Sequence, residues 1–264
     1  MNTDIKFENC HVMLGDCLSR MKEIPDDSID LTVTSPPYDN LRTYKGYSFD
    51  FEGIAKELCR ITKEGGVVVW IVNDATIKGT ETGTSFRQAL YFKDVCGFNL
   101  HDTMIWNKGS FTAVGSLATR YGPVFEYMFI LSKGKPKSFN PLKDRKNKVS
   151  GKMGGRLRLA DGSMKEMSTN GKDRAEFGQR FAIWDIPPCG GNASGHPAPF
   201  PEALANDHIL SWSNEGDTVF DPFTGSGTTA KMALLNNRKF IGCEISDEYM
   251  GIIHDRLRCF YGAY

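Results

Sequence analysis

Residues 34–38 read TSPPY, and these residue types favour the binding of a planar amine. Pro36 and Pro37 have a fixed φ and no backbone N–H, and a residue that precedes a proline is biased to an extended conformation. The segment is therefore stiff, and the hydroxyl of Ser35 and the carbonyl of Pro36 can each accept one hydrogen from an exocyclic amino group. Two such bonds would aim the nitrogen lone pair at an electrophile, and the ring of Tyr38 would stack on a planar base, worth about 1–3 kcal/mol. The alternative is a proline-rich strand exit followed by a surface tyrosine.

A second candidate site is the glycine-rich stretch DPFTGSGTTA at residues 221–230. The glycines in the pattern Gly225-x-Gly227-x-x-Ala230 let the backbone approach a ligand closely, and a helix that follows offers free N–H groups. An acidic residue at the end of the next strand, here Glu244, can accept hydrogen bonds from both ribose hydroxyls of an adenosine-containing ligand. The stretch lacks the Gly-Lys-Ser/Thr of a Walker loop. Taken alone, it also fits a nicotinamide dehydrogenase or a tight turn that binds no ligand.

The apolar pattern predicts the strands and helices that must position these two stretches. Short apolar or β-branched runs predict strands at residues 11–14, 29–33, 67–72, 99–108, 124–134, 218–220 and 239–246, with 99–108 and 124–134 as an antiparallel pair. Helical spacing predicts helices near residues 18–24, 49–66, 85–96, 200–213, 228–237 and 247–260, and the pair Gly65-Gly66 is expected to end the second helix. The alternation predicts an α/β fold whose mostly parallel sheet has helices on both faces. Because such sheets bind ligands outside the carboxyl ends of their strands, we expect both stretches to face one crevice.

Residues 133–180 form a basic segment within a chain whose net charge is zero. The segment holds 14 Lys and Arg but only five Asp and Glu, a formal charge of +9. Hydrophobic periodicity disappears across residues 135–180, and a stretch this long without clear elements is usually functional or disordered. We therefore place a separate region at residues 135–184, between the two parts of the main domain, 1–134 and 185–264. A nucleic-acid contact surface and a solvated loop both explain the charge.

Taken together, the two stretches resemble the motifs of amino-group DNA methyltransferases that use S-adenosylmethionine. The catalytic motif of that family, [D/N/S]PP[Y/F/W], is matched by SPPY at residues 35–38, and its cofactor motif by residues 221–228. A segment similar to HPAPFPEAL at residues 196–204 usually precedes the cofactor motif. The order of catalytic motif, recognition region and cofactor motif resembles the circularly permuted beta group. The resemblance implies a class I, Rossmann-like doubly wound fold with the basic segment as its target-recognition insertion.

The resemblance also assigns roles to individual residues, with S-adenosylmethionine as cofactor and S-adenosylhomocysteine as its product. Glu244 would bind the ribose hydroxyls, and Asp16 would meet the adenine amino group, although an aspartate at such a place is more often a helix N-cap. The other residues expected in the cofactor site are Thr34, His196, Pro199, Phe200, Pro201, Asp221, Phe223, Gly225, Ser226, Gly227 and Thr228. The catalytic residues would be Ser35, Pro36, Pro37 and Tyr38. The methyl group leaves a sulfonium, so the amine can attack in line without a covalent enzyme intermediate.

Double-stranded DNA is the substrate that the resemblance implies, with the target base flipped out of the duplex. Phosphate contacts from the basic segment can offset the cost of flipping and would make binding sensitive to salt. The DNA-binding residues expected there are Lys143, Arg145, Lys146, Lys148, Lys152, Arg156 and Arg158. A mobile loop at residues 39–47 is expected to close over the site, with Arg42, Tyr44 and Lys45 touching DNA.

The target atom distinguishes the remaining interpretations. In the family, Ser at the first motif position usually accompanies N4-cytosine methylation and Asp or Asn N6-adenine methylation, so we expect cytosine, with adenine as the alternative. A C5-cytosine enzyme needs a cysteine nucleophile, but Pro188-Cys189 lacks the surrounding motif, and we interpret Cys189 as structural or incidental. A protein-glutamine methyltransferase typically has Asn where this chain has Ser35, and it lacks a basic insertion. A nicotinamide oxidoreductase does not explain SPPY, and a catalytically silent DNA-binding protein needs neither motif.

The composition of the chain indicates in which compartment the protein works and which partners it lacks. The chain is 40% hydrophobic and 24% charged, has no apolar run of the about 18 residues that span a membrane, and begins without a signal pattern. We therefore expect a cytoplasmic protein without membrane contact. The seven cysteines form no CxxC pair and the histidines show no ligand spacing, so we expect no metal. The resemblance further suggests a homodimer and a restriction-modification system with a cognate restriction endonuclease.

Overall fold

The computed structural model describes residues 3–37, 49–110, 117–189 and 201–261. The chain divides into two compact units: Met1–Asn140 with Ala182–Tyr264, and Pro141–Phe181. Both ends of the region that we expected at 135–184 belong to the first unit. The backbone N–H of Lys137 donates to the carbonyl of Gly65 at 2.9 Å, and Ile183–Asp185 form a strand of the main sheet.

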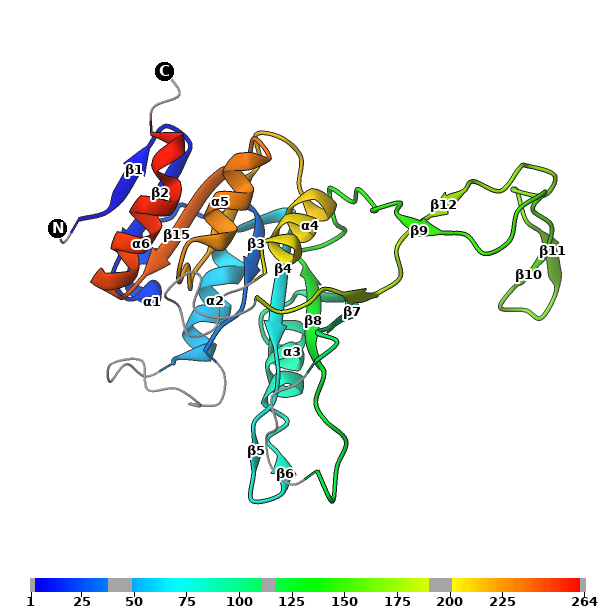
Figure 1. The fold of residues 1–264 in the computed structure, drawn as a ribbon, viewed down its shortest axis with the longest axis horizontal. Helices are drawn as coiled ribbons and strands as arrows, with labels where there is room; N and C mark the ends of the chain where they lie inside the picture. Colours follow the sequence, from blue (N-terminus) through cyan, green and yellow to red (C-terminus); the bar gives the residue numbers. More distant parts are fainter. Residues whose placement is uncertain (1–2, 38–48, 111–116, 190–200, 262–264) are drawn as a thin grey trace. The chain divides into compact units, whose positions relative to one another are not determined.

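A nine-stranded sheet forms the centre of the first unit (Figure 1). In spatial order its strands are β1 (Ile5–Phe7), β2 (Cys10–Leu14), β15 (Lys239–Glu244), β14 (Thr218–Asp221), β3 (Ile29–Thr34), β4 (Thr62–Val72), β8 (Phe125–Ser132), β7 (Asn99–Asn107) and β13 (Ile183–Asp185). The strands from β2 to β4 are parallel, and β7 and β8 form the expected antiparallel pair. The two edge strands, β1 and β13, were not predicted, because three residues are too few to show a period.

Helices cover both faces of this sheet, which confirms the predicted doubly wound α/β architecture. On one face, α1 (Cys17–Met21), α2 (Phe51–Ile61) and α3 (Thr84–Asp94) pack into a core that includes Trp70 and Phe92. The other face is covered by α4 (Glu202–Trp212), α5 (Thr228–Leu235) and α6 (Asp247–Leu257), and a 3-10 turn at Arg258–Phe260 follows (Figure 1). Leu204, Ile209 and Trp212 are among the buried residues of α4. None of the described helices is both long enough and apolar enough to cross a membrane.

The junction between α2 and β4 differs from the prediction. The helix ends at Ile61, and Gly65 and Gly66 lie inside the strand that starts at Thr62. Gly65 has a φ of 78°, and a Cβ on Gly66 would lie 2.7 Å from the Thr62 side chain. The glycine pair therefore serves close backbone packing at the start of β4, whereas the helix passes directly into the strand without a glycine stop.

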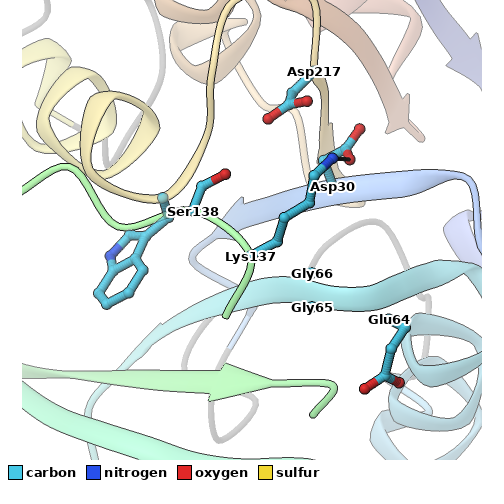
Figure 2. A pocket seen from close by; sticks show the side chains of 8 residues that line it. Asp30, Glu64, Gly65, Gly66, Lys137, Ser138 and Asp217 are labelled. Atoms are coloured by element: carbon cyan, nitrogen blue, oxygen red, sulfur yellow. Dashed lines mark ion pairs between the residues drawn. The ribbon is translucent and has the colours of Figure 1, made fainter. Parts of the chain in front are cut away.

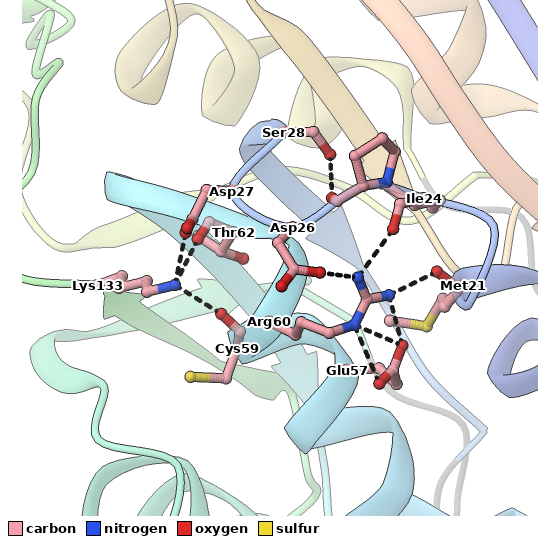
Figure 3. Close-up of polar contacts among 11 residues, drawn as sticks. Met21, Ile24, Asp26, Asp27, Ser28, Glu57, Cys59, Arg60, Thr62 and Lys133 are labelled. Atoms are coloured by element: carbon pink, nitrogen blue, oxygen red, sulfur yellow. Dashed lines mark hydrogen bonds and ion pairs between the residues drawn. The ribbon is translucent and has the colours of Figure 1, made fainter.

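An arginine anchors the amino edge of the sheet (Figure 3). Arg60, in the last turn of α2, donates to the carbonyls of Met21 at 2.8 Å and Ile24 at 2.9 Å, and it pairs with Glu57 and Asp26. The hydrogen bonds to Glu57 are the main cause of a raised pKa for this guanidinium. Arg60 thus fastens the loop that precedes β3 to α2 and helps to fix where β3 begins.

A small pocket lies at the same amino edge (Figure 2). Its lining residues are Asp30, Glu64, Gly65, Gly66, Lys137, Ser138, Trp212 and Asp217. The buried Asp30 accepts hydrogen bonds from Lys63 at 2.6 Å and from the backbone of Thr218 at 3.0 Å. Because these bonds join the first residues of β3, β4 and β14, we interpret Asp30 as structural. The two sequence motifs lie at the opposite ends of the same strands.

The second unit, Pro141–Phe181, contains short strand pairs and no buried side chain, and every one of its residues is described. β9 (Arg145–Lys146) pairs with β12 (Phe177–Gly178), and β10 (Arg156–Arg158) pairs with β11 (Met164–Glu166). In the first unit, β5 (Thr76–Ile77) and β6 (Thr80–Glu81) form a similar short hairpin.

Candidate active site

The two sequence motifs meet at the point in the sheet where the chain connections from neighbouring strands run in opposite directions. β14 and β3 are neighbours, but the chain leaves them in opposite directions. From β14 it crosses through α5 to β15, and from β3 it crosses through α2, on the other face, to β4. Open α/β sheets bind ligands outside the carboxyl ends of their strands at such a reversal. Ser35 directly follows β3 and Pro222 directly follows β14, so both motifs lie at this position.

A buried carboxylate joins the two motifs. The hydroxyl of Thr34 donates to Oδ1 of Asp221 at 2.7 Å, although the two residues are 187 positions apart. The hydroxyl of Thr229 donates to Oδ2 of Asp221 at 2.8 Å, and the backbone of Phe223 donates to Oδ1 at 3.0 Å. Burial raises the pKa of Asp221 to about 6 against the effect of these donors. The position of Ser35 is thus coupled to that of the glycine turn through one side chain.

The glycine turn begins α5. Gly227 is the N-cap of the helix with a φ of 81°, and a Cβ there would lie 3.3 Å from Ile253 on α6. Gly225 also has a positive φ, 54°. Because a glycine N-cap has no side chain, the first N–H groups of α5 are available to a ligand. Only glycine fits the turn without strain, which explains the spacing of the two glycines.

Glu244 lies at the carboxyl end of β15, beside the glycine turn. Its Oε2 accepts from the backbone of Gly225 and its Oε1 from the backbone of Ser246, both at 2.8 Å. Burial is the largest cause that raises the pKa of Glu244, to about 7, and the nearby Asp221 raises it further. Each carboxylate oxygen has a second lone pair. The side chain can therefore accept two more donors, as a ribose diol would require.

The described part of the catalytic motif is packed against the fold. Pro36 is buried, and Ser35 and Pro37 are partly exposed. Tyr38 lies outside the described residues, as do Arg42, Tyr44 and Lys45 of the expected loop at 39–47.

The other predicted cofactor residues lie at the same edge where they are described. Asp16 is the N-cap of α1 and accepts from the backbone of Ser19 at 3.0 Å, which is the structural role that we weighed for it. Phe223 packs edge-on against Phe49, with ring centroids 5.8 Å apart. Pro201 is buried at the start of α4. Outside the described residues lie His196, Pro199 and Phe200.

Arg256 on α6 was missed by the sequence analysis. Its guanidinium donates to the carbonyl and the hydroxyl of Ser226, at 3.1 and 3.0 Å, and to Glu202 at 2.7 Å. Lys231 of α5 donates to the same Glu202 oxygen at 2.7 Å. The cluster of Arg256, Glu202 and Lys231 stabilises the glycine turn through the contacts of Arg256 with Ser226. Its members come from three helices, and no local pattern in the sequence relates them.

The predicted DNA-binding residues of the basic segment all fall in the second unit, and the structure separates them by their contacts. Arg145 is held inside the unit, because it donates to the carbonyl of Gln179 at 2.9 Å and lies 4.2 Å from the ring of Phe181. Arg156 and Arg158 are exposed on β10. The remaining members of the predicted set are Lys143, Lys146, Lys148 and Lys152.

Cys189 is a free, exposed cysteine. Desolvation is the main cause that raises the pKa of its thiol, and the thiolate is the reactive form. The interpretation of Cys189 as structural or incidental stays a prediction.

Several solved structures have a similar fold. A PvuII DNA methyltransferase, cytosine-N4-specific, has a TM-score of 0.71 at 22% identity over 95% of this chain and 87% of that one. The M1.HpyAVI–SAM complex has a TM-score of 0.61 at 20% identity over 94% of this chain and all of that one. These likenesses concern the fold alone.

The chain belongs to the N6_N4_Mtase family of DNA methylases, whose family model matches residues 29–255. Among curated relatives, the orphan methyltransferase M.BamHII of Bacillus amyloliquefaciens is 61% identical over 252 residues, 90% of this chain and 92% of that protein. The DNA adenine methyltransferase YhdJ of Escherichia coli K12 is 30% identical over 264 residues, 90% of this chain and 79% of that protein. The family is thus established, and the proteins to which this chain is similar include some described as acting on different bases.

Proposed function

We propose that this DNA methylase transfers a methyl group from S-adenosylmethionine to the exocyclic N4 of cytosine in duplex DNA, and that it belongs to the permuted beta group. The observation that carries the proposal is the bond from Thr34 to Asp221, which joins the amine-binding motif to the glycine turn. The order of the motifs supports the beta group, since the strand that ends in Ser35 precedes the cofactor strand β14 in the chain.

The residues at the carboxyl edge fit an adenosine-containing sulfonium. Glu244 has the free lone pairs that a ribose diol needs, and the glycine turn with the start of α5 lies beside it. The cofactor, when bound, supplies a methyl group on a positively charged sulfur. In this proposal the residues beside its methionine portion are Thr34, Pro201, Asp221, Phe223, Gly225, Ser226, Gly227 and Thr228, together with His196, Pro199 and Phe200. Asp16 would accept from the adenine amino group.

The chemistry of the chain itself is orientation. The hydroxyl oxygen of Ser35 and the carbonyl of Pro36 accept the two hydrogens of the amino group, and Tyr38 stacks on the flipped base. The nitrogen then attacks the methyl carbon in line, the carbon–sulfur bond breaks with its electrons on sulfur, and the methylated amine loses a proton to solvent. Positioning of this kind can lower a barrier by about 7–11 kcal/mol.

The choice of base is supported by Ser35, because Ser at this position usually accompanies N4-cytosine methylation in the family. N6 of adenine is the second candidate, and the relationship to an adenine methyltransferase favours it. The duplex, a homodimer and a cognate restriction endonuclease are the proposed partners. Mass spectrometry of nucleosides from duplex DNA treated with the protein and S-adenosylmethionine tests the proposal directly. We expect N4-methylcytosine; N6-methyladenine instead would establish the second candidate, and no methylated base would contradict both.

The pKa of Glu244 predicts how cofactor binding depends on pH. Only the ionised carboxylate can accept both ribose hydroxyls, and burial raises its pKa in the free protein to about 7. As the pH falls below 7 the group becomes protonated, so we expect the Kd for S-adenosylmethionine to be about tenfold weaker at pH 6 than at pH 8. Isothermal titration calorimetry at several pH values measures this. The variant Glu244→Gln should bind more weakly at pH 8 but show no step near pH 7, whereas a step that persists in it would contradict the assignment.

A further inference from the structure

The second unit carries a feature that the proposed function does not explain: a β-hairpin with two chemically different faces. β10 and β11 pair with Arg156 opposite Glu166, Leu157 opposite Lys165 and Arg158 opposite Met164. Residues opposite each other in an antiparallel pair share a face, and successive residues alternate. One face therefore presents Arg156, Arg158, Met164 and Glu166. The other presents Leu157 and Lys165.

The turn fixes this register. The backbone of Gly162 donates to the carbonyl of Leu159 at 2.9 Å, and Asp161 accepts from both the backbone and the hydroxyl of Ser163. Gly162 has a φ of 86°, which favours glycine at this position. A register slip of one residue would exchange the two faces, so the turn determines which side chains share the arginine face.

The hairpin needs a partner. Leu157 is 51% and Met164 56% exposed, and no side chain of Pro141–Phe181 is buried. An isolated two-stranded hairpin is marginally stable in water. The unit holds eleven Lys and Arg against five Asp and Glu, a formal charge of +6, so the partner that fits it is a polyanion.

Arg156 and Arg158 differ from Arg145 and Arg180 in their contacts. Arg145 and Arg180 are held by internal contacts, the latter by an ion pair with Asp144. Within the part of the chain that the structure describes, the side chains of Arg156 and Arg158 have no hydrogen-bond or ion-pair partner. Their guanidinium groups are therefore free to make bidentate contacts.

We propose that the arginine face of the β10–β11 hairpin enters the major groove of the substrate DNA, where Arg156 and Arg158 each read a guanine. The inference rests on the proposed function and extends it to sequence specificity. The major groove admits a two-stranded β-ribbon, and a bidentate arginine contact to O6 and N7 of guanine is the commonest specific contact there. Glu166, on the same face, can accept from N4 of cytosine, and Met164 can contact a thymine methyl group. Lys165, on the other face, reads no base.

The test compares Arg156→Gln, Arg158→Gln and, as a matched control, Lys165→Gln in the full-length chain. Single-molecule sequencing of DNA methylated by the wild type first gives the recognition sequence. We expect each arginine variant to lower kcat/KM on that sequence by about 10- to 100-fold. On duplexes in which the guanine read by that arginine is replaced by another base, the variant should methylate at nearly the rate of the wild-type protein on the same duplexes. Its specificity is therefore relaxed at that one position. Lys165→Gln should lower the rates on all duplexes by a similar, small factor.

A second measurement locates the groove. Replacement of the same guanine by 7-deazaguanine removes the N7 acceptor from the major groove, so it should weaken binding by the wild type but not further weaken binding by the corresponding arginine variant. An unchanged affinity for S-adenosylmethionine would show that the first unit of each variant is folded. If the methylation rates of the arginine variants fall by the same factor on all duplexes, or do not fall, the hairpin proposal is overturned. Methylation of DNA by the wild type would still uphold the proposed function. A wild type that methylates no duplex would overturn both.

Discussion

Replacement of Ser35 by Ala should abolish most of the methyl transfer while leaving cofactor binding intact. The hydroxyl oxygen of Ser35 is proposed to accept one of the two amino hydrogens, an interaction that strengthens as the nitrogen attacks. Loss of one preorganised hydrogen-bond partner of a transition state typically costs about 100- to 1000-fold in kcat. We therefore expect a decrease of at least about 100-fold in single-turnover methylation of duplex DNA, measured as methylated nucleoside. The Kd for S-adenosylmethionine should stay within about twofold.

Two control variants distinguish this loss from a structural effect. Ser35→Asn keeps a side-chain acceptor and should retain more activity than Ser35→Ala. Ser28→Ala removes a serine hydroxyl at the opposite edge of the sheet, where it donates to the carbonyl of Pro25 at 2.6 Å, and it should keep wild-type rates. Wild-type rates in Ser35→Ala would mean that the serine does not bind the amine.

Replacement of Glu244 by Ala should cause the largest loss of cofactor binding. Two hydrogen bonds from ribose hydroxyls to a charged acceptor are lost, and bonds to charged groups contribute about 1.5–3 kcal/mol each. We expect the Kd for S-adenosylmethionine to rise by at least about 100-fold, measured by calorimetry at pH 8.

The fold of the Glu244→Ala variant needs its own readout, because this side chain also accepts from Gly225 and Ser246. Urea unfolding without cofactor should show that the variant is folded. It should also show that the added stability that S-adenosylmethionine gives the wild type is absent at the same concentration. A variant that is stabilised as much as the wild type would show that Glu244 does not hold the ribose.

The sequence predicted the centre of the sheet well, for a physical reason. β3 and the second half of β4 are runs of buried, mostly β-branched residues, which few structures other than an interior parallel strand can accommodate. The two motifs were placed at strand ends because the prolines that follow Thr34 and Asp221 have no N–H to donate to a sheet ladder. Given a parallel sheet, the strand ends then share one edge.

Features that depend on contacts between distant residues could not be predicted. The Gly65-Gly66 pair was expected to stop a helix, but its close packing against Thr62 and Asp30 exists only in the folded sheet. Arg256 lies on a helix with an ordinary polar face, and only the tertiary structure shows that it holds Ser226. The second unit lacks buried residues, so it has no periodicity by which its strand pairs could be found.

The way in which the second unit is attached has a consequence for how its length can change. The residues on either side of Pro141–Phe181 are held within the first unit by hydrogen bonds. The backbone of Asn140 donates to the carbonyl of Ser211 at 2.8 Å, and the carbonyl of Ala182 accepts from Ile105 at 2.8 Å. Between such anchors, doubling the length of a flexible insertion adds only about 0.6 kcal/mol of closure entropy. The segment between Asn140 and Ala182 can therefore change in length at little cost to the first unit, and the strand ends where the two sequence motifs lie would stay in place.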